Sequence, residues 1–190
     1  MSKSINGTPV ARQVDGGQNF VEVDEDSSGA AAISVVHKSI HDGIHYFMEG
    51  WTELNNTDEF YVKLVTPSDK EAHFSWTIEA TGVLETDFYE GASGGMTGGT
   101  SVTPINSNRN SANTSGLTLT KGVSAPSSTG TTISSVKFGV AGRAWRMKGG
   151  EVGRDNEIIL KKDTIYCRKF VSSSDNNYVH FLASWYEIAD

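Results

Sequence analysis

The sequence predicts an all-β protein, an antiparallel β-sandwich of jelly-roll-like type with an extended N-terminal arm. Three observations support this prediction. Apolar and polar residues alternate along many short runs, turn-forming residues separate these runs, and residues 1–30 contain too few apolar side chains to build a core. Because successive side chains of a strand point to opposite faces, such alternation is typical of half-buried strands.

The arm, residues 1–30, is rich in Gly, Asp, Glu, Gln and Ser, with few apolar side chains among them. Burying so little apolar surface does not offset the entropy lost when such a segment becomes ordered. Two interpretations remain open: an arm that is ordered against a neighbouring molecule, and a plain flexible tail. In the first case we expect the interface to include Val10, Val14, Phe20 and Val21.

Residues 31–190 are predicted to form a single sandwich domain. The clearest strand is Glu71–Ala80, whose apolar residues fall on one face and whose polar residues fall on the other. A helix would scatter the same apolar residues around its circumference. The other candidate strands, in chain order, are Ile33–Ile40, Ile44–Trp51, Glu59–Thr66, Val83–Glu90, Gly116–Val123, Val136–Val140, Glu157–Lys161, Thr164–Val171 and Val179–Trp185.

Turn formers separate these runs, as expected for hairpins and short loops. They are Asp42-Gly43, Asn55-Asn56, Pro67-Ser68-Asp69, Gly149-Gly150 and Asp175-Asn176-Asn177. Of the candidate strands, only Glu157–Lys161 is also compatible with a helix. Roughly ten short strands separated in this way indicate a sandwich or barrel.

Residues 91–130 are dominated by Gly, Ser, Thr and Asn. They form either long exposed loops, bridged by a short strand around Leu117 and Leu119, or a linker between two domains. We expect loops within one sandwich, because too few core residues follow for a second domain.

The length and the net charge of the chain bear on which kinds of function are expected. A chain of 190 residues with 37% hydrophobic residues is long enough for a core without disulfide or metal support. The net charge is −7, and the nearest approach to a basic stripe is Arg143, Arg146, Lys148 and Arg154. Nucleic-acid binders normally carry such a stripe, so a nucleic-acid partner is not expected.

Cys167 is the only cysteine, so no intrachain disulfide can form, and its strand-like surroundings predict a buried, apolar-like side chain. No apolar run reaches the length of a membrane span. The start of the chain has no apolar signal-peptide region. We therefore expect synthesis in a reducing cytoplasm and no membrane association.

One motif resembles a hydrolase nucleophile. Gly91-Ala92-Ser93-Gly94-Gly95 fits the pattern G-x-S-x-G, and His41, Asp58 and Ser93 follow the chain order of trypsin-like triads. The elbow needs a helix directly after the serine, whereas the residues that follow are rich in Gly and Thr. Chain order carries little weight, since triads are defined by geometry. We interpret the motif as a loop and expect no enzymatic activity and no catalytic residues.

Two metal-site patterns are also incomplete. Asp24–Gly29 begins like a calcium-binding loop, but Val35 occupies the position of the bidentate glutamate. His37, His41 and His45 are spaced by four and would share a helix face suited to zinc. We predict strands there, with Asp42-Gly43 turning the chain, so the histidines should not converge. His45 and His73 are expected to be ordinary half-exposed side chains, and no metal or cofactor is expected.

The aromatic residues suggest a sugar-stacking surface as another alternative. Most of them, Trp51 included, lie on alternating strands, where a role in the core or in an interface explains them more simply. Trp145 lies between Arg143 and Arg146 in a loop-like stretch, so it joins the candidate interface residues.

Several segments, taken in order, resemble a family of small virion structural proteins of tailed bacteriophages. The resemblance runs from residue 40 to residue 187. The segments are Ile40–Phe47, Lys63–Pro67, Ala72–Trp76, Phe88–Ala92, Asn106–Ser111, Glu157–Leu160, Thr164–Tyr166 and Phe181–Glu187.

This resemblance implies a virion component without catalytic residues, similar to jelly-roll decoration (cement) proteins that clamp neighbouring major capsid subunits. The implied partners are the major capsid protein and further copies of the chain, typically in a trimer. The implied location is the capsid surface, after synthesis in the cytoplasm of the host bacterium. A tail or baseplate position, with host-glycan contact through the Asn/Ser/Thr loops and Trp145, is the alternative.

Overall fold

A computed structural model describes residues 11–14, 17–20, 34–139, 148–150 and 157–189. The chain divides into two compact units, Met1–Lys38 and Ser39–Asp190. In the first unit, strands β1 (Ala11–Val14) and β2 (Gly17–Phe20) form an antiparallel hairpin in which Ala11 lies opposite Phe20.

A short helix, α1 (Val35–His41), lies where a strand was predicted at Ile33–Ile40. That prediction was wrong. Ser34 caps the helix, because its hydroxyl accepts a hydrogen bond from the His37 N–H at 3.2 Å and its carbonyl accepts one from the Lys38 N–H at 2.9 Å. An N-terminal cap of this kind outweighs the strand preference of the β-branched residues that follow it.

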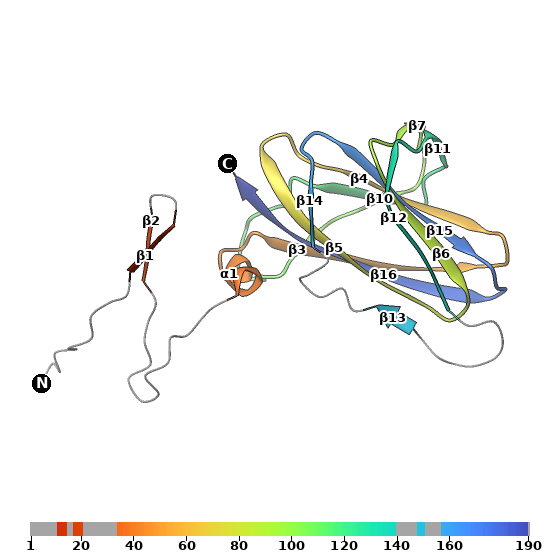
Figure 1. Cartoon of the computed structure of the whole chain (residues 1–190), viewed down its shortest axis with the longest axis horizontal. Coiled ribbons are helices and arrows are strands. Elements are labelled where there is room, and N and C mark those ends of the chain that lie inside the picture. Colours follow the sequence, from red (N-terminus) through yellow and green to blue (C-terminus); the bar gives the residue numbers. More distant parts are fainter. Residues whose placement is uncertain (1–10, 15–16, 21–33, 140–147, 151–156, 190) are drawn as a thin grey trace, which may run out of the picture. The chain divides into compact units, whose positions relative to one another are not determined.

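The second unit is an antiparallel sandwich of two principal sheets packed against each other, as predicted (Figure 1). Sheet one has the order β12-β6-β15-β4-β10-β8, and sheet two has the order β13-β5-β16-β3-β9, with β14 also pairing with β5. The strands of sheet one are β12 (Thr131–Phe138), β6 (Leu84–Glu90), β15 (Ile165–Ser172), β4 (Glu59–Val65), β10 (Thr118–Lys121) and β8 (Thr100–Val102). Those of sheet two are β13 (Lys148–Gly150), β5 (Lys70–Ala80), β16 (Asn177–Ala189), β3 (His45–Leu54), β9 (Ile105–Asn106) and β14 (Ile158–Leu160).

The chain passes repeatedly from one sheet to the other. The order β5-β16-β3-β9 in sheet two is matched by β6-β15-β4-β10 in sheet one, so each of these strands has its chain neighbour in the opposite sheet. The last two strands, β15 and β16, therefore lie between strands formed earlier in the chain. This insertion is the feature that the sandwich shares with a jelly roll.

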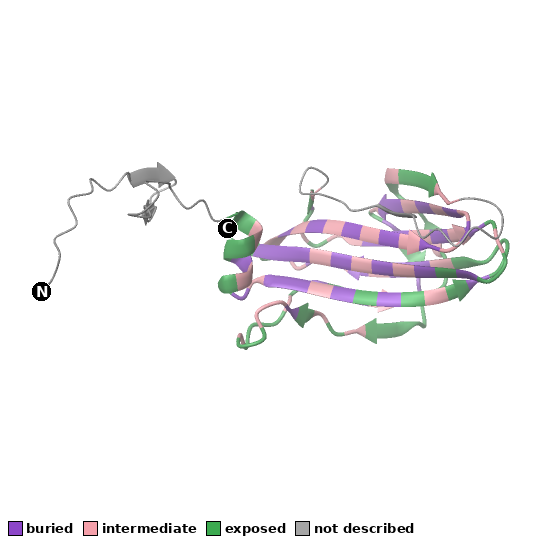
Figure 2. Cartoon of the chain, turned by 90° about the horizontal axis from the view of Figure 1, so that it is seen from below, coloured by how far each residue is buried: buried purple, intermediate pink, exposed green. Residues whose placement is uncertain are grey.

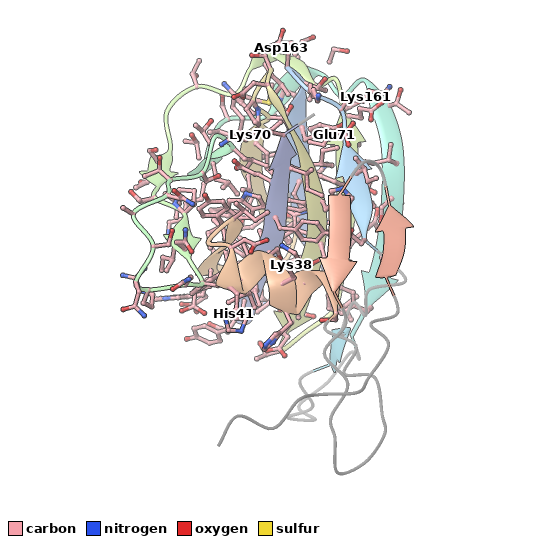
Figure 3. The ribbon with its side chains drawn as sticks, turned by 90° about the vertical axis from the view of Figure 1, so that its left-hand side faces the viewer. Lys38, His41, Lys70, Glu71, Lys161 and Asp163 are labelled. Carbon is pink, nitrogen blue, oxygen red and sulfur yellow. The ribbon has the colours of Figure 1, made fainter. Side chains whose placement is uncertain are left out.

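Alternating burial along the strands confirms the two-residue pattern. Inward positions of β5, from Ala72 to Ala80, are all buried, and the positions between them are only partly buried (Figure 2). The inward aromatic side chains join the sheets: the Phe74 ring of sheet two stacks on Phe88 of sheet one, with ring centroids 6.1 Å apart. Within sheet two, Phe74 stacks on Trp185, its cross-strand neighbour on β16, with ring centroids 6.0 Å apart.

The Glu157–Lys161 region contains strand β14, as predicted, and not the helix with which its sequence is also compatible. Two other segments differ from what the sequence pattern predicts. Residues 91–130 contain more strand than one short bridge, including the small sheet of β7 (Ser93–Gly95) and β11 (Pro126–Ser128), while Leu117 and Leu119 belong to the main core. Val136 of β12 remains 47% exposed, since β12 is an edge strand with an irregular register between Thr132 and Ser134.

Candidate interaction surface

The two sheets differ in what lies over their outer faces. On sheet one, Tyr61, Tyr89 and Cys167 point outward and form a second buried cluster with residues of the β7–β11 region. Among the described residues, no comparable cluster lies over sheet two. Within the described part of the chain, the side chains of sheet two that point away from the core are covered less than those of sheet one, although His45 and Tyr186 among them are buried.

We call this surface the outer face of sheet two. It consists of the side chains of β3, β5 and β16 that point away from the core, together with Ile159 of β14. From β3 come His45, Phe47, Glu49, Trp51 and Glu53; from β5, Glu71, His73, Ser75, Thr77 and Glu79; from β16, Tyr178, His180, Leu182, Ser184, Tyr186 and Ile188.

Large apolar side chains on this face are exposed. Trp51 is 65% exposed and lies directly opposite His180 in the strand register. Tyr178, Ile159 and Ile188 are also exposed on the same face. Of the two roles predicted for Trp51, a place in the core is thus wrong. Exposed Trp and Tyr side chains grouped on one face are typical of binding surfaces, where they act as anchors.

The described charged side chains of this face, histidines aside, are all acidic. Its described side chains include Glu49, Glu53, Glu71 and Glu79 but no Lys or Arg. On sheet one, by contrast, outward-pointing charges neutralise one another, as in the ion pair of Lys169 with Glu59 at 2.6 Å. An acidic face with exposed aromatic side chains is electrostatically complementary to a basic partner surface.

Each of the three long strands contributes a histidine to this face: His45 from β3, His73 from β5 and His180 from β16. Each ring nitrogen of His180 lies 3.9 Å from a glutamate oxygen, one on Glu49 and one on Glu79. The ring of His73 stacks on Tyr186 with centroids 4.5 Å apart, and its Nδ1 is 2.6 Å from Oε1 of Glu157. The Tyr186 hydroxyl donates to the same Glu157 oxygen at 2.7 Å.

His45 is buried, contrary to the half-exposed position predicted for it. Its Nδ1 lies 2.6 Å from the Ser107 hydroxyl and its Nε2 lies 3.1 Å from the Ser184 hydroxyl. Desolvation lowers the pKa of His45, so the neutral ring is favoured. The contact with Ser184 resembles a nucleophile–base pair in distance, but the second ring nitrogen meets a hydroxyl where a triad has a carboxylate. What this arrangement does is to join β3, β16 and the segment after β9.

The hydrolase motif has a different geometry from a nucleophile elbow. Ser93 lies in strand β7, exposed and paired with Ser128 of β11, not in a strand-to-helix turn. The carboxylate of Asp58 accepts a hydrogen bond from the Asn55 N–H at 2.8 Å. His41 ends helix α1.

The predicted histidine pattern is partly helical. His37 and His41 are one turn apart on α1, whereas His45 begins β3. The described part of the chain contains no group of three or more His, Cys, Asp or Glu side chains placed to hold a metal ion. The acidic segment Asp24–Gly29 lies outside the described residues.

The interface residues predicted from the sequence are mostly outside the described chain. Val10, Val21 and Trp145 are not described, and Val14 and Phe20 are described only as backbone in β1 and β2. Their role in an interface stays a prediction.

Cys167 is fully buried, as predicted, and desolvation raises its pKa to about 11. Sequence reasoning missed two buried ionisable side chains, Arg168 and Glu187. Both occupy inward positions of alternating strands, and this position is the signal that could have identified them.

No described helix is long and apolar enough to cross a membrane. Comparison of the chain with protein-family models, with curated proteins and with solved structures finds no match.

Proposed function

We propose that this protein is a structural component of a tailed-bacteriophage virion, a decoration (cement) protein that stabilises the head by bridging major capsid subunits. The observation that carries the proposal is the outer face of sheet two, which combines exposed Trp51 and Tyr178 with acidic side chains. A β-sandwich with such a face suits a protein that acts by binding to another surface.

The outer face of sheet two is the proposed contact with the capsid. Trp51 supplies the buried anchor of the interface, and Glu49 and Glu79 pair with Lys or Arg of the capsid subunit. Because an icosahedral shell repeats the same surface many times, modest individual contacts add up when several copies are linked in a trimer. The arm, with Val10, Val14, Phe20 and Val21, is proposed to extend the contact to a neighbouring subunit.

The location is tested first. Heads and tails separated from the phage that encodes this protein are analysed by mass spectrometry. We expect the protein in the head fraction; its presence only in tails would favour the second candidate, a tail or baseplate protein. The exposure of Trp51 and Tyr178 also suits that candidate, since aromatic rings on an open sheet face can stack on sugars of a host glycan.

The contact surface is tested on heads from a phage that lacks the gene. Trp51→Ala should weaken binding of the purified protein about 30-fold or more, the effect of losing ~2 kcal/mol at an interface hot spot. Val136→Ala is the matched control, because Val136 is an exposed apolar residue of sheet one. Equal binding by the two variants and the unmodified protein would remove the outer face of sheet two from the proposal.

A charge reversal gives the second arm of the same test. Glu49→Lys should weaken binding and reduce its dependence on salt, because one favourable long-range attraction becomes repulsive. Glu85→Lys is the control on sheet one, where Glu85 is an exposed partner of Lys137. Binding that responds equally to both reversals would point to a nonspecific effect of net charge.

A further inference from the structure

Arg168 is a cationic side chain inside the sandwich. It lies in β15 at an inward position, between Tyr166 and Phe170, and is only 5% exposed. In the strand register it is opposite Val62 on β4 and Phe88 on β6. Its surroundings are thus those of a core residue.

Aromatic rings line the guanidinium. The Arg168 Cζ lies 5.6 Å from the ring centroid of Phe88 and 5.9 Å from that of Trp76, within the range of cation–π contacts. Trp76 belongs to sheet two and Phe88 to sheet one, so the charge is held between the sheets. Desolvation lowers the pKa of Arg168 to about 10, and the negative charge of Asp87 opposes this shift in part.

No acceptor in the described chain satisfies this cation. Arg168 makes no ion pair with a described carboxylate, and its Nε is sealed from solvent without a hydrogen-bond partner. Buried charges in proteins are almost always paired, because removing an ion from water costs several kcal/mol that only a partner recovers. The cation–π contacts recover a part of that cost but provide no acceptor for the N–H groups.

Two further side-chain donors, Trp76 Nε1 and Thr86 Oγ1, are also buried without an acceptor in the described chain. The Trp76 ring lies 6.2 Å from the Phe88 ring, and Thr86 precedes Phe88 by two residues on the same face of β6. In the described residues these two and Arg168 Nε are the buried side-chain nitrogen and oxygen atoms without a partner, and all three belong to groups able to donate. Trp76 and Arg168 are in contact and each has an unsatisfied buried donor, which indicates a missing acceptor beside them.

From this arrangement we propose that Arg168 anchors an anion site between the two sheets, which takes a carboxylate. A carboxylate fits best, because the planar guanidinium presents paired N–H groups to two oxygens at once and the aromatic walls exclude competing water. Its source is either a small free acid, such as acetate, or a carboxylate side chain of a protein segment. The site is independent of the proposed role in the virion.

Thermal unfolding of the full chain tests the site, with sodium acetate as the probe and Arg168→Met as the comparison variant. If a free carboxylate binds, acetate raises the Tm of the unmodified protein by several degrees in a saturable way. The Tm of Arg168→Met then does not respond to acetate. Without acetate, this variant is at least as stable as the unmodified protein, because an unpaired buried charge has been replaced by an apolar side chain of similar length.

A carboxylate from a protein segment gives a different pattern. The unmodified protein then ignores acetate, and Arg168→Met has a Tm lower by several degrees at neutral pH. This difference shrinks as the pH falls below about 4, the ordinary carboxyl pKa, and is lost as the pH passes through the lower pKa of the paired carboxyl. Such pH dependence separates a lost ion pair from lost packing, which does not titrate.

Two outcomes overturn the proposal. One is an equal response of both proteins to acetate, which is a general salt effect. The other is an unmodified protein that ignores acetate while Arg168→Met is equally or more stable at every pH, which means that no acceptor is present.

Discussion

The carboxylate of Glu187 accepts a hydrogen bond from the backbone N–H of Leu117 at 3.0 Å, and this contact fixes the end of β16 to the segment before β10. The same carboxylate accepts hydrogen bonds from the Gly116 N–H at 3.0 Å and from Trp185 Nε1 at 3.2 Å. Lys70 adds an ion pair at 3.4 Å. Glu187 therefore fixes the conformation of residues 115–117, which belong to the Gly/Ser/Thr/Asn-rich region.

This arrangement predicts acid-sensitive stability. Burial alone would raise the pKa of Glu187, but the hydrogen bonds from Ser115, Gly116, Leu117 and Trp185 outweigh it, and the pKa lies below its ordinary value of 4.5. A depressed carboxyl pKa stabilises the folded state above the ordinary value, and this contribution is lost as the pH falls through the folded-state pKa.

Glu187→Gln should therefore reduce the free energy of unfolding by about 1–3 kcal/mol at pH 7, measured by urea unfolding. The loss should shrink as the pH falls below the ordinary carboxyl pKa. Glu53→Gln is the control, since Glu53 is exposed on the outer face of sheet two. If Glu187→Gln reduced the free energy of unfolding by the same amount down to pH 2, the ionised carboxylate would not be the source of the stability.

The stacked contact of Phe74 with Phe88 and Trp185 predicts a large effect of truncation. Phe74→Ala should reduce the free energy of unfolding by about 3–5 kcal/mol, because it opens a cavity at the junction of the two sheets. Trp51→Ala removes an even larger side chain, yet it should change stability by only about 0.5 kcal/mol or less, because Trp51 is exposed. Similar losses for the two variants, measured by urea unfolding, would mean that Trp51 is packed in solution.

Cys167 should be inert in the folded protein. It is fully buried and desolvation raises its pKa to about 11, so both access and thiolate formation are suppressed at pH 8. We expect a thiol reagent such as iodoacetamide to leave the native protein unmodified and to alkylate it rapidly in urea, as read by intact mass. Rapid alkylation without urea would show that the cluster of Tyr61, Tyr89 and Cys167 opens readily.

Much of the sandwich could be predicted from the sequence, because β5 and β16 have one face in the core and one face outside it. Alternation therefore records the fold directly in these strands. The same reasoning failed at α1, where a single local cap at Ser34 decides the structure. Edge strand β12 shows another limit, since its apolar Val136 follows the alternating pattern and is nevertheless 47% exposed.

The site residues were harder to predict, because their environment comes from distant parts of the chain. His45 is buried, and its hydrogen-bond partners Ser107 and Ser184 are far from it in sequence, so its polar position on a strand predicted the wrong exposure. Arg168 and Glu187 occupy inward positions, but charged side chains are expected at the surface. Their surroundings become clear only in the folded structure, where Glu187 accepts several hydrogen bonds and the Nε of Arg168 has no acceptor among the described residues.

Gly43 lies in the turn between α1 and β3 at φ +70°, a backbone conformation that side chains disfavour. A Cβ added at this position would lie 2.3 Å from the Ser111 hydroxyl oxygen, so the loop after β9 packs directly against the turn. Gly91 has a similar φ of +73°, but nothing lies within 4 Å of the position of its Cβ. The two glycines thus share the backbone requirement and differ only in the steric contact.

This difference predicts two magnitudes. Gly91→Ala should reduce the free energy of unfolding by about 1 kcal/mol, the cost of the backbone conformation alone. Gly43→Ala should lose about 1–3 kcal/mol more, because Ser111 must move and the hydrogen bond from the Asn106 side chain to the Gly43 carbonyl, 2.8 Å long, is strained with it. Urea unfolding measures the free energy of unfolding of both variants. Equal reductions would show that the loop carrying Ser111 can move without destabilising the fold.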